Sequence, residues 1–102
     1  MRYVMVRYRV KAGRAEENEA LVRAVYAELA QAGPAGLGYA TFKLPDGVSF
    51  VHLSASDGEN GNAALTELPA FKRFVADIAE RCDEPPVVSD VSEVGAFALF
   101  GR

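Results

Sequence analysis

The sequence predicts one α+β domain, residues 1–102, with the element order βαββαβ of a ferredoxin-like sandwich. Three observations predict it. The chain opens on a strand-like alternation, it carries two segments with helical periodicity, and a β-hairpin lies between those segments. A segment rich in Val, Phe and Leu then closes the chain. Right-handed crossovers place both helices on one face of an antiparallel sheet, in strand order 4-1-3-2.

Residues 3–10 alternate in character and predict the first strand. One face carries Val4, Val6, Tyr8 and Val10, and the other carries Tyr3, Met5, Arg7 and Arg9. Gly13 ends this strand. Glu16 and Glu17 favour a helix start because acidic side chains stabilise the positive N-terminal end. Apolar residues recur at helical spacing with Asn18 until Gly33-Pro34, which predicts a helix over residues 14–32.

The hairpin spans residues 39–56 and turns at Leu44-Pro45-Asp46-Gly47-Val48. Pro45, Asp46 and Gly47 suit a three-residue loop with a bulge. That loop sets Leu44 opposite Val48, Phe42 opposite Phe50 and Ala40 opposite His52. A two-residue Asp46-Gly47 loop would slip the register by one and set Lys43 opposite Phe50. We prefer the first register, because it places Phe42, Phe50 and His52 on one face and Val51, Leu53 and Ala55 on the other.

Residues 57–62 are polar and glycine-rich and predict an exposed loop. The stripe Phe71, Phe74, Val75, Ile78 and Cys82 predicts an amphipathic helix within residues 63–82, with Pro69 in its first turn and an optional short turn upstream. Asp83-Glu84-Pro85-Pro86 stops this helix. Residues 87–100 predict the fourth strand, with a bulge at Gly95.

Only one face of such a sheet is covered by helices. The more aliphatic face of the sheet is expected to meet the helices. It carries Val4, Val6, Tyr8 and Val10 of the first strand and Val51, Leu53 and Ala55 of the third. The other face would then expose an apolar surface too large for a monomer. A second copy of the same sheet is the simplest cover, so we expect a homodimer.

Composition excludes several classes of function. A net charge of −3 with dispersed Lys and Arg argues against nucleic acid and anionic membranes as partners. The N-terminal segment lacks a long apolar run and a cleavage site, so the expected location is the cytoplasm. One Cys, one His and no phosphate-binding glycine motif leave no basis for a metal site or an organic cofactor.

These segments together resemble the dimeric α+β barrel superfamily, and within it the antibiotic biosynthesis monooxygenase-like proteins. The resemblance covers nearly the whole chain and rests on the following stretches: Arg7-Tyr8-Arg9-Val10-Lys11-Ala12-Gly13, the third strand from Phe50 to Asp57, Pro69-Ala70-Phe71-Lys72-Arg73-Phe74, and Val94-Gly95. It implies a homodimer whose two sheets face each other across a lumen, and in several members oxygenation of polycyclic or quinol-like substrates without a cofactor.

The chain departs from the family pattern at four places. The strand-three tryptophan position falls at Ser54, the glutamate two residues earlier falls at His52, and the histidine of helix two falls at Ala70. The family's Lys-Pro-Gly reads Lys11-Ala12-Gly13. The resemblance therefore implies the fold more strongly than it implies the monooxygenase activity.

The candidate site is centred on His52, the single histidine, whose imidazole can act as a general base or a hydrogen-bond donor near neutral pH. The alternative is a structural histidine satisfied by neighbouring groups. The expected ligand is a small apolar or aromatic molecule in the lumen between the sheets, and the candidate contacts are Tyr3, Arg7, Phe42, Phe50 and Ser54. The sequence leaves open whether the protein is an enzyme or a non-catalytic dimer with a packed lumen.

Overall fold

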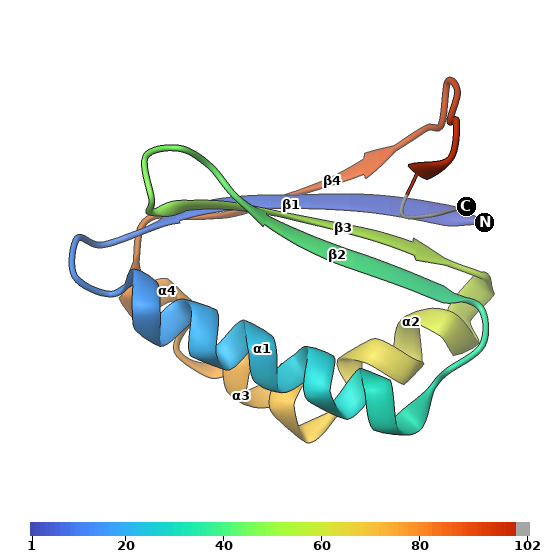
Figure 1. The fold of residues 1–102 in the computed structure, drawn as a ribbon, viewed down its shortest axis with the longest axis horizontal. Coiled ribbons are helices and arrows are strands. Elements are labelled where there is room, and N and C mark those ends of the chain that lie inside the picture. The colour runs from blue at the N-terminus through green and yellow to red at the C-terminus, as the bar shows by residue number, and fades with distance from the viewer. Residues whose placement is uncertain (100–102) are drawn as a thin grey trace.

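The computed structural model describes residues 1–99, apart from the side chains of residues 59 and 60. Its elements run β1 (Arg2–Val10), α1 (Ala15–Ala32), β2 (Leu37–Lys43), β3 (Ser49–Ser56), α2 (Gly58–Thr66), α3 (Pro69–Ala76), α4 (Ile78–Arg81) and β4 (Cys82–Val91). The antiparallel sheet has the order β2-β3-β1-β4, as predicted. Figure 1 shows helices α1 to α4 on one face of this sheet. Among the described residues no helix or strand labelled in the figure packs across the opposite face, called here the open face.

The core lies between the sheet and the helices, on the face of β1 that the alternation predicted. Tyr8 and Val10 are buried there against Val22 and Val25 of α1 and Phe74 of α3. Burial of such side chains typically stabilises a fold by about 1.5–3 kcal/mol each. The predicted first helix is confirmed.

The preferred register of the hairpin was wrong by one residue. Lys43 pairs with Phe50, Thr41 with His52 and Tyr39 with Ser54. The loop is longer than either loop considered: Leu44 N–H donates to Ser49 O, and Pro45–Val48 lie between them. The Asp46 carboxylate accepts hydrogen bonds from the Val48 and Ser49 amides at 2.9 and 2.8 Å, and this closes the four-residue loop.

This register turns β3 over relative to the prediction, because a shift of one residue moves every side chain to the other face. Phe50 and His52 face the helices and are buried. Val51 and Leu53 pair with Arg7 and Met5 and lie on the open face. β1 and β2 keep their predicted faces.

The C-terminal half differs from the prediction in its boundaries. α2 begins at Gly58, inside the predicted loop of residues 57–62, and ends at Thr66. The helix predicted within residues 63–82 is divided among the end of α2, α3 and α4. β4 begins at Cys82 and includes Pro85 and Pro86, which an edge strand tolerates because one side of its backbone needs no partner. Cys82 is buried, as expected of a small core residue. The end of the predicted fourth strand, residue 100, lies outside the described residues.

Candidate functional site

His52 is buried on the helix-facing side of β3, with its side chain only 3% exposed. Its Nε2 lies 2.8 Å from the Tyr8 hydroxyl oxygen. Its Nδ1 lies 2.6 Å from the hydroxyl oxygen of Tyr39 and 3.1 Å from that of Thr41. The two strands next to β3 provide these partners. On β1, Val6 is paired with His52 and Tyr8 lies two residues further along the same face. On β2, Thr41 is paired with His52 and Tyr39 lies two residues before it.

A chain of buried polar groups continues from Tyr8 to Arg81. Asn18 of α1 donates from Nδ2 to the Tyr8 oxygen at 2.8 Å. Asn18 Oδ1 accepts from Arg81 Nε at 3.2 Å, and Arg81 also donates to the Phe74 carbonyl at 2.6 Å. The Arg81 guanidinium, 1% exposed, lies 5.5 Å from the centre of the Phe74 ring. Among the side chains that the structure describes, no carboxylate is within ion-pair distance of Arg81.

Aromatic contacts fix the orientation of the imidazole. The His52 ring is stacked on Phe74 with centroids 5.3 Å apart, and it is tilted against Tyr8 at 5.3 Å. Tyr8 is in turn stacked on Phe50 at 5.5 Å. Stacked and tilted pairs at these separations are favourable arrangements for aromatic rings.

Burial keeps the polar groups of this site neutral at pH 7. It lowers the pKa of His52 to about 4, because the charged imidazolium would lose its hydration. Burial also raises the pKa of Tyr8 and that of Tyr39 well above the ordinary value for tyrosine. The site is therefore an uncharged imidazole between two protonated tyrosines.

A cavity of about 440 Å³ lies between the sheet and helices α2–α4, and His52 forms part of its polar end. Tyr8, Tyr39 and Ser54 share that end. Most of the remaining lining is apolar and consists of Val4, Val6, Leu65, Phe71, Phe74, Val75, Ile78, Pro86 and Val88. Arg2, Asn62 and Thr66 also line the cavity. Its volume falls within the range of small-molecule sites, and apolar walls with a few convergent polar groups are the usual form of such a site. We call it the helix-side cavity.

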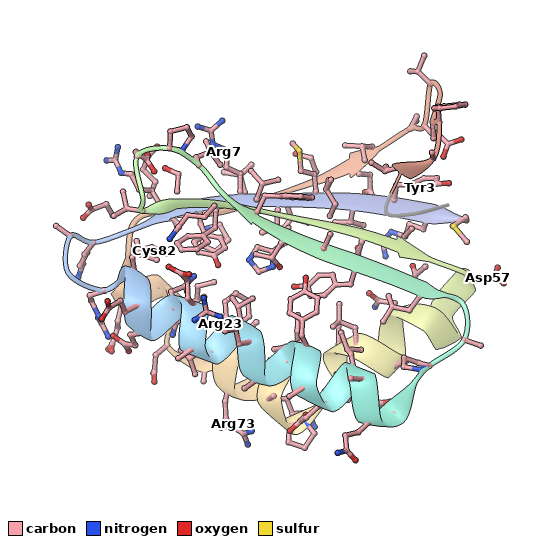
Figure 2. The ribbon with its side chains drawn as sticks, in the orientation of Figure 1. Tyr3, Arg7, Arg23, Asp57, Arg73 and Cys82 are labelled. Carbon is pink, nitrogen blue, oxygen red and sulfur yellow. The ribbon has the colours of Figure 1, made fainter. Side chains whose placement is uncertain are left out.

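A second cavity of about 360 Å³ lies on the open face, under the segment that follows β4. Tyr3 and Leu53 line it with Val91 and Leu99, and the Tyr3 hydroxyl donates to a Glu93 carboxylate oxygen at 2.9 Å. In Figure 2, Tyr3 and Arg7 both extend from the face of the sheet turned away from the helices.

The structure therefore divides the predicted site residues between two faces. Phe50, His52 and Ser54 face the helices, and the prediction that they face the lumen was wrong because of the register. Tyr3, Arg7 and Phe42 lie on the open face as predicted, and Phe42 is 47% exposed. The two groups are on opposite sides of the sheet, and of these predicted residues only Ser54 lines both cavities, as Val4 also does.

Sequence reasoning missed the partners of His52. The sequence pattern predicts Tyr8 only as a residue that packs against the helices, and it does not indicate Tyr39 or Arg81 as partners of His52. One signal was present: Asn18 occupies a position in the apolar stripe of the first helix, and a polar residue there must find a buried partner. Within the described part of the chain, no group of three or more His, Cys, Asp or Glu residues is placed to hold a metal ion. No helix there is long and apolar enough to cross a membrane.

Solved structures similar to this chain across its length include antibiotic biosynthesis monooxygenases. One structure described as an antibiotic biosynthesis monooxygenase has a TM-score of 0.77 at 19% identity, with 93% of this chain and 100% of that chain covered. Rv0793 from Mycobacterium tuberculosis has a TM-score of 0.76 at 16% identity, covering 93% and 96%. PA3566 from Pseudomonas aeruginosa has a TM-score of 0.74 at 16% identity, covering 92% and 94%.

This likeness establishes the fold alone, which is a ferredoxin-like α+β fold with a four-stranded antiparallel sheet. No family model and no curated protein matches the sequence.

Proposed function

We propose that the protein is a homodimer in which each protomer binds a small, neutral, apolar or aromatic molecule in the helix-side cavity beside His52. The observation that carries this proposal is the cavity itself: a mainly apolar lining meets a group of polar side chains that includes Tyr8, Tyr39 and His52. All three are uncharged at pH 7 because burial disfavours their charged forms. The cation among the described lining residues, Arg2, is already paired with Asp90 at 3.1 Å, so neutral ligands are favoured.

The second part of the proposal, the homodimer, rests on the open face. Met5, Phe42, Val51, Leu53 and Val87 form an apolar surface on four adjacent strands. Phe42 and Val87 are 47% and 63% exposed. A second copy packed sheet against sheet would bury this surface, and the similar solved fold supports that arrangement. Tyr3 and Arg7 would then lie at the interface.

Catalysis is a further step of the proposal. The likeness to a structure described as an antibiotic biosynthesis monooxygenase favours oxygenation. The family resemblance of the sequence implies that such a reaction proceeds without metal or organic cofactor. In such a reaction an activated methylene and O2 give a carbonyl and water, and the substrate supplies all the electrons. Tyr8 and His52 form the route for the proton, because the Tyr8 hydroxyl can pass its proton to Nε2 as it takes one from the substrate.

Binding is tested by thermal shift with a panel of neutral aromatic compounds and aromatic acids. Ser54→Trp fills the cavity from its polar end, and Ala35→Trp, in an exposed loop, is the matched control. Neutral compounds should stabilise wild type and Ala35→Trp by several degrees and leave Ser54→Trp unshifted. If no compound shifts wild type, the non-catalytic alternative with a packed interior stands.

Catalysis is tested separately with 18O2. A bound aromatic compound with an activated methylene should gain one 18O atom in its carbonyl product, and His52→Gln should slow this reaction. If the compound binds but its product contains no 18O, the binding part of the proposal stands and the catalytic part is wrong.

A further inference from the structure

Arg81 is linked to His52 by a chain of hydrogen bonds through Asn18 and Tyr8. The chemistry of the arginine determines which group donates in each of these bonds. A guanidinium has only donors, so the Asn18 atom 3.2 Å from Arg81 Nε is the amide oxygen. The amide nitrogen of Asn18 then donates to the Tyr8 oxygen. Asn18 is completely buried, so water cannot offer it an alternative.

The hydrogen bond from Asn18 to Tyr8 also determines that Tyr8 donates to His52. The Tyr8 oxygen accepts from Asn18, and its own proton needs an acceptor. His52 Nε2, at 2.8 Å, is the only other described group within hydrogen-bond distance of this hydroxyl. Tyr8 is 2% exposed, so its proton is donated to Nε2 and that nitrogen carries no proton.

A neutral imidazole with an unprotonated Nε2 carries its proton on Nδ1. Nδ1–H then donates to the Tyr39 oxygen at 2.6 Å, with the Thr41 oxygen at 3.1 Å beside it. The Thr41 hydroxyl is already engaged with the Tyr26 hydroxyl at 2.8 Å. Tyr39 thus accepts from His52, and its own proton is left for the Thr41 oxygen, with which it also hydrogen-bonds, or for a ligand that displaces this bond.

We infer that Arg81 and Asn18 fix His52 in its Nδ1–H tautomer, and that this leaves Tyr39 as the hydrogen-bond donor of the helix-side cavity. The ligand class follows, and this part rests on the proposed function: the ligand is apolar and neutral and presents an acceptor oxygen, such as a ketone carbonyl, to Tyr39. Arg81 and Asn18 are positioning residues, because they act on the ligand only through Tyr8, His52 and Tyr39.

The tautomer is measured by long-range 1H–15N NMR on protein labelled with [15N]histidine and free of a histidine tag. His52 is the only histidine, so the spectrum holds one imidazole. At pH 7 wild type should show a protonated Nδ1 and an unprotonated Nε2. A protonated Nε2 in wild type would overturn the inference, whatever the variants do.

Asn18→Asp should reverse the tautomer. The new carboxylate is only an acceptor, so it takes the Arg81 Nε–H on one oxygen and the Tyr8 proton on the other. Tyr8 must then accept from His52, which places the imidazole proton on Nε2. Thr41→Val, which changes the other end of the chain, is the control and should keep the wild-type tautomer. A folded Asn18→Asp protein with the wild-type tautomer would contradict the role of Asn18.

The ligand class is tested with 1-tetralone, an aromatic ketone, and tetralin, which has the same rings without the carbonyl. Wild type should bind the ketone about tenfold more tightly, the order of one hydrogen bond. Tyr39→Phe and Asn18→Asp should reduce this preference to about twofold or less, and Tyr26→Phe should keep it, because Tyr26 does not line the helix-side cavity.

The outcomes separate the two proposals. Equal binding of ketone and hydrocarbon by wild type would overturn Tyr39 as the donor and leave the cavity intact. Failure of both compounds to bind would count against the cavity and the ligand class together, while the NMR spectrum would still decide the tautomer.

Discussion

His52 Nε2 and the Tyr8 hydroxyl are 2.8 Å apart, and both side chains are almost completely buried between the sheet and the helices. Tyr8 is 2% and His52 3% exposed, so neither is hydrated as it would be in the unfolded chain. Protonation of the His52 imidazole therefore lowers the stability of the folded protein. The free energy of unfolding, measured as a function of pH, reports this effect.

Stability should fall between pH 6.5 and pH 4 because of His52. The folded-state pKa is lowered from 6.5 to about 4 by burial, so between these values the unfolded chain binds a proton that the folded chain does not. The neutral ring is thus fully accommodated above pH 6.5, and the free energy of unfolding decreases as the pH falls towards 4. A pKa difference of one corresponds to about 1.4 kcal/mol, which predicts a loss on the order of 3 kcal/mol.

The measurement is urea denaturation across this pH range for wild type and His52→Gln. Both proteins contain the same carboxylates, so the difference between their pH profiles isolates the imidazole. Parallel profiles would show that His52 titrates in the folded protein as it does in the unfolded chain.

Gly61→Ala should destabilise the protein. A Cβ at this position of α2 would lie 2.5 Å from the carbonyl oxygen of Gly36, which is backbone and cannot rotate away. Forced shifts of this kind typically cost about 1–3 kcal/mol. Gly95→Ala is the control, since a Cβ there meets nothing within 4 Å. Chemical denaturation should separate the two variants clearly, and equal midpoints would contradict the close approach of α2 to Gly36.

Leu53→Asp should produce a monomer. Leu53 lies on the open face at the centre of the proposed interface, opposite Met5 on β1 and Ala40 on β2. A carboxylate there would be buried without a partner, which typically costs several kcal/mol. Light scattering should give a dimer for wild type and for Lys72→Asp, an exposed position on α3. A monomeric wild type would remove the dimer from the proposal.

Much of the fold could be predicted from periodicity alone. The alternation of residues 3–10 identified the buried face of β1, and the βαββ order with a final strand determined the strand order. The C-terminal half was less predictable. Gly58 and Gly61 made α2 resemble a loop, and Pro85-Pro86 suggested the end of a helix where an edge strand continues.

The candidate site could be predicted only in part, because β3 has two apolar faces. Phe50 and His52 alternate with Val51 and Leu53, so periodicity does not say which set meets the helices. The register decides, and the register goes with the length of a loop that the Asp46 side chain closes by hydrogen bonds. The Asp46 carboxylate accepts hydrogen bonds from the Val48 and Ser49 amides in this loop. Turn propensities of single residues do not predict such side-chain hydrogen bonds. His52 was identified, but its face was not.

Asp46→Ala should therefore weaken the protein more than its exposed position suggests. Its carboxylate accepts hydrogen bonds from the Ser49 hydroxyl and from the Val48 and Ser49 amides. These bonds, first the one from Ser49 Oγ, lower the pKa of Asp46. A lowered pKa means that the stabilisation is present above the unfolded-state pKa and is lost as the pH falls through the folded-state pKa.

The denaturation midpoint of Asp46→Ala should lie below that of wild type at pH 7, and the gap should narrow as the pH falls below 4. Asp83→Ala, also exposed, is the control and should change little. The register itself can be followed by nuclear Overhauser contacts between the α protons of Thr41 and His52, which are paired in the native hairpin. Loss of these contacts in Asp46→Ala, with Ala40 paired to His52 instead, would show that this one carboxylate selects the face on which His52 lies. An unchanged register with an unchanged midpoint would instead assign that selection to the burial of Phe50 and His52 beneath the helices.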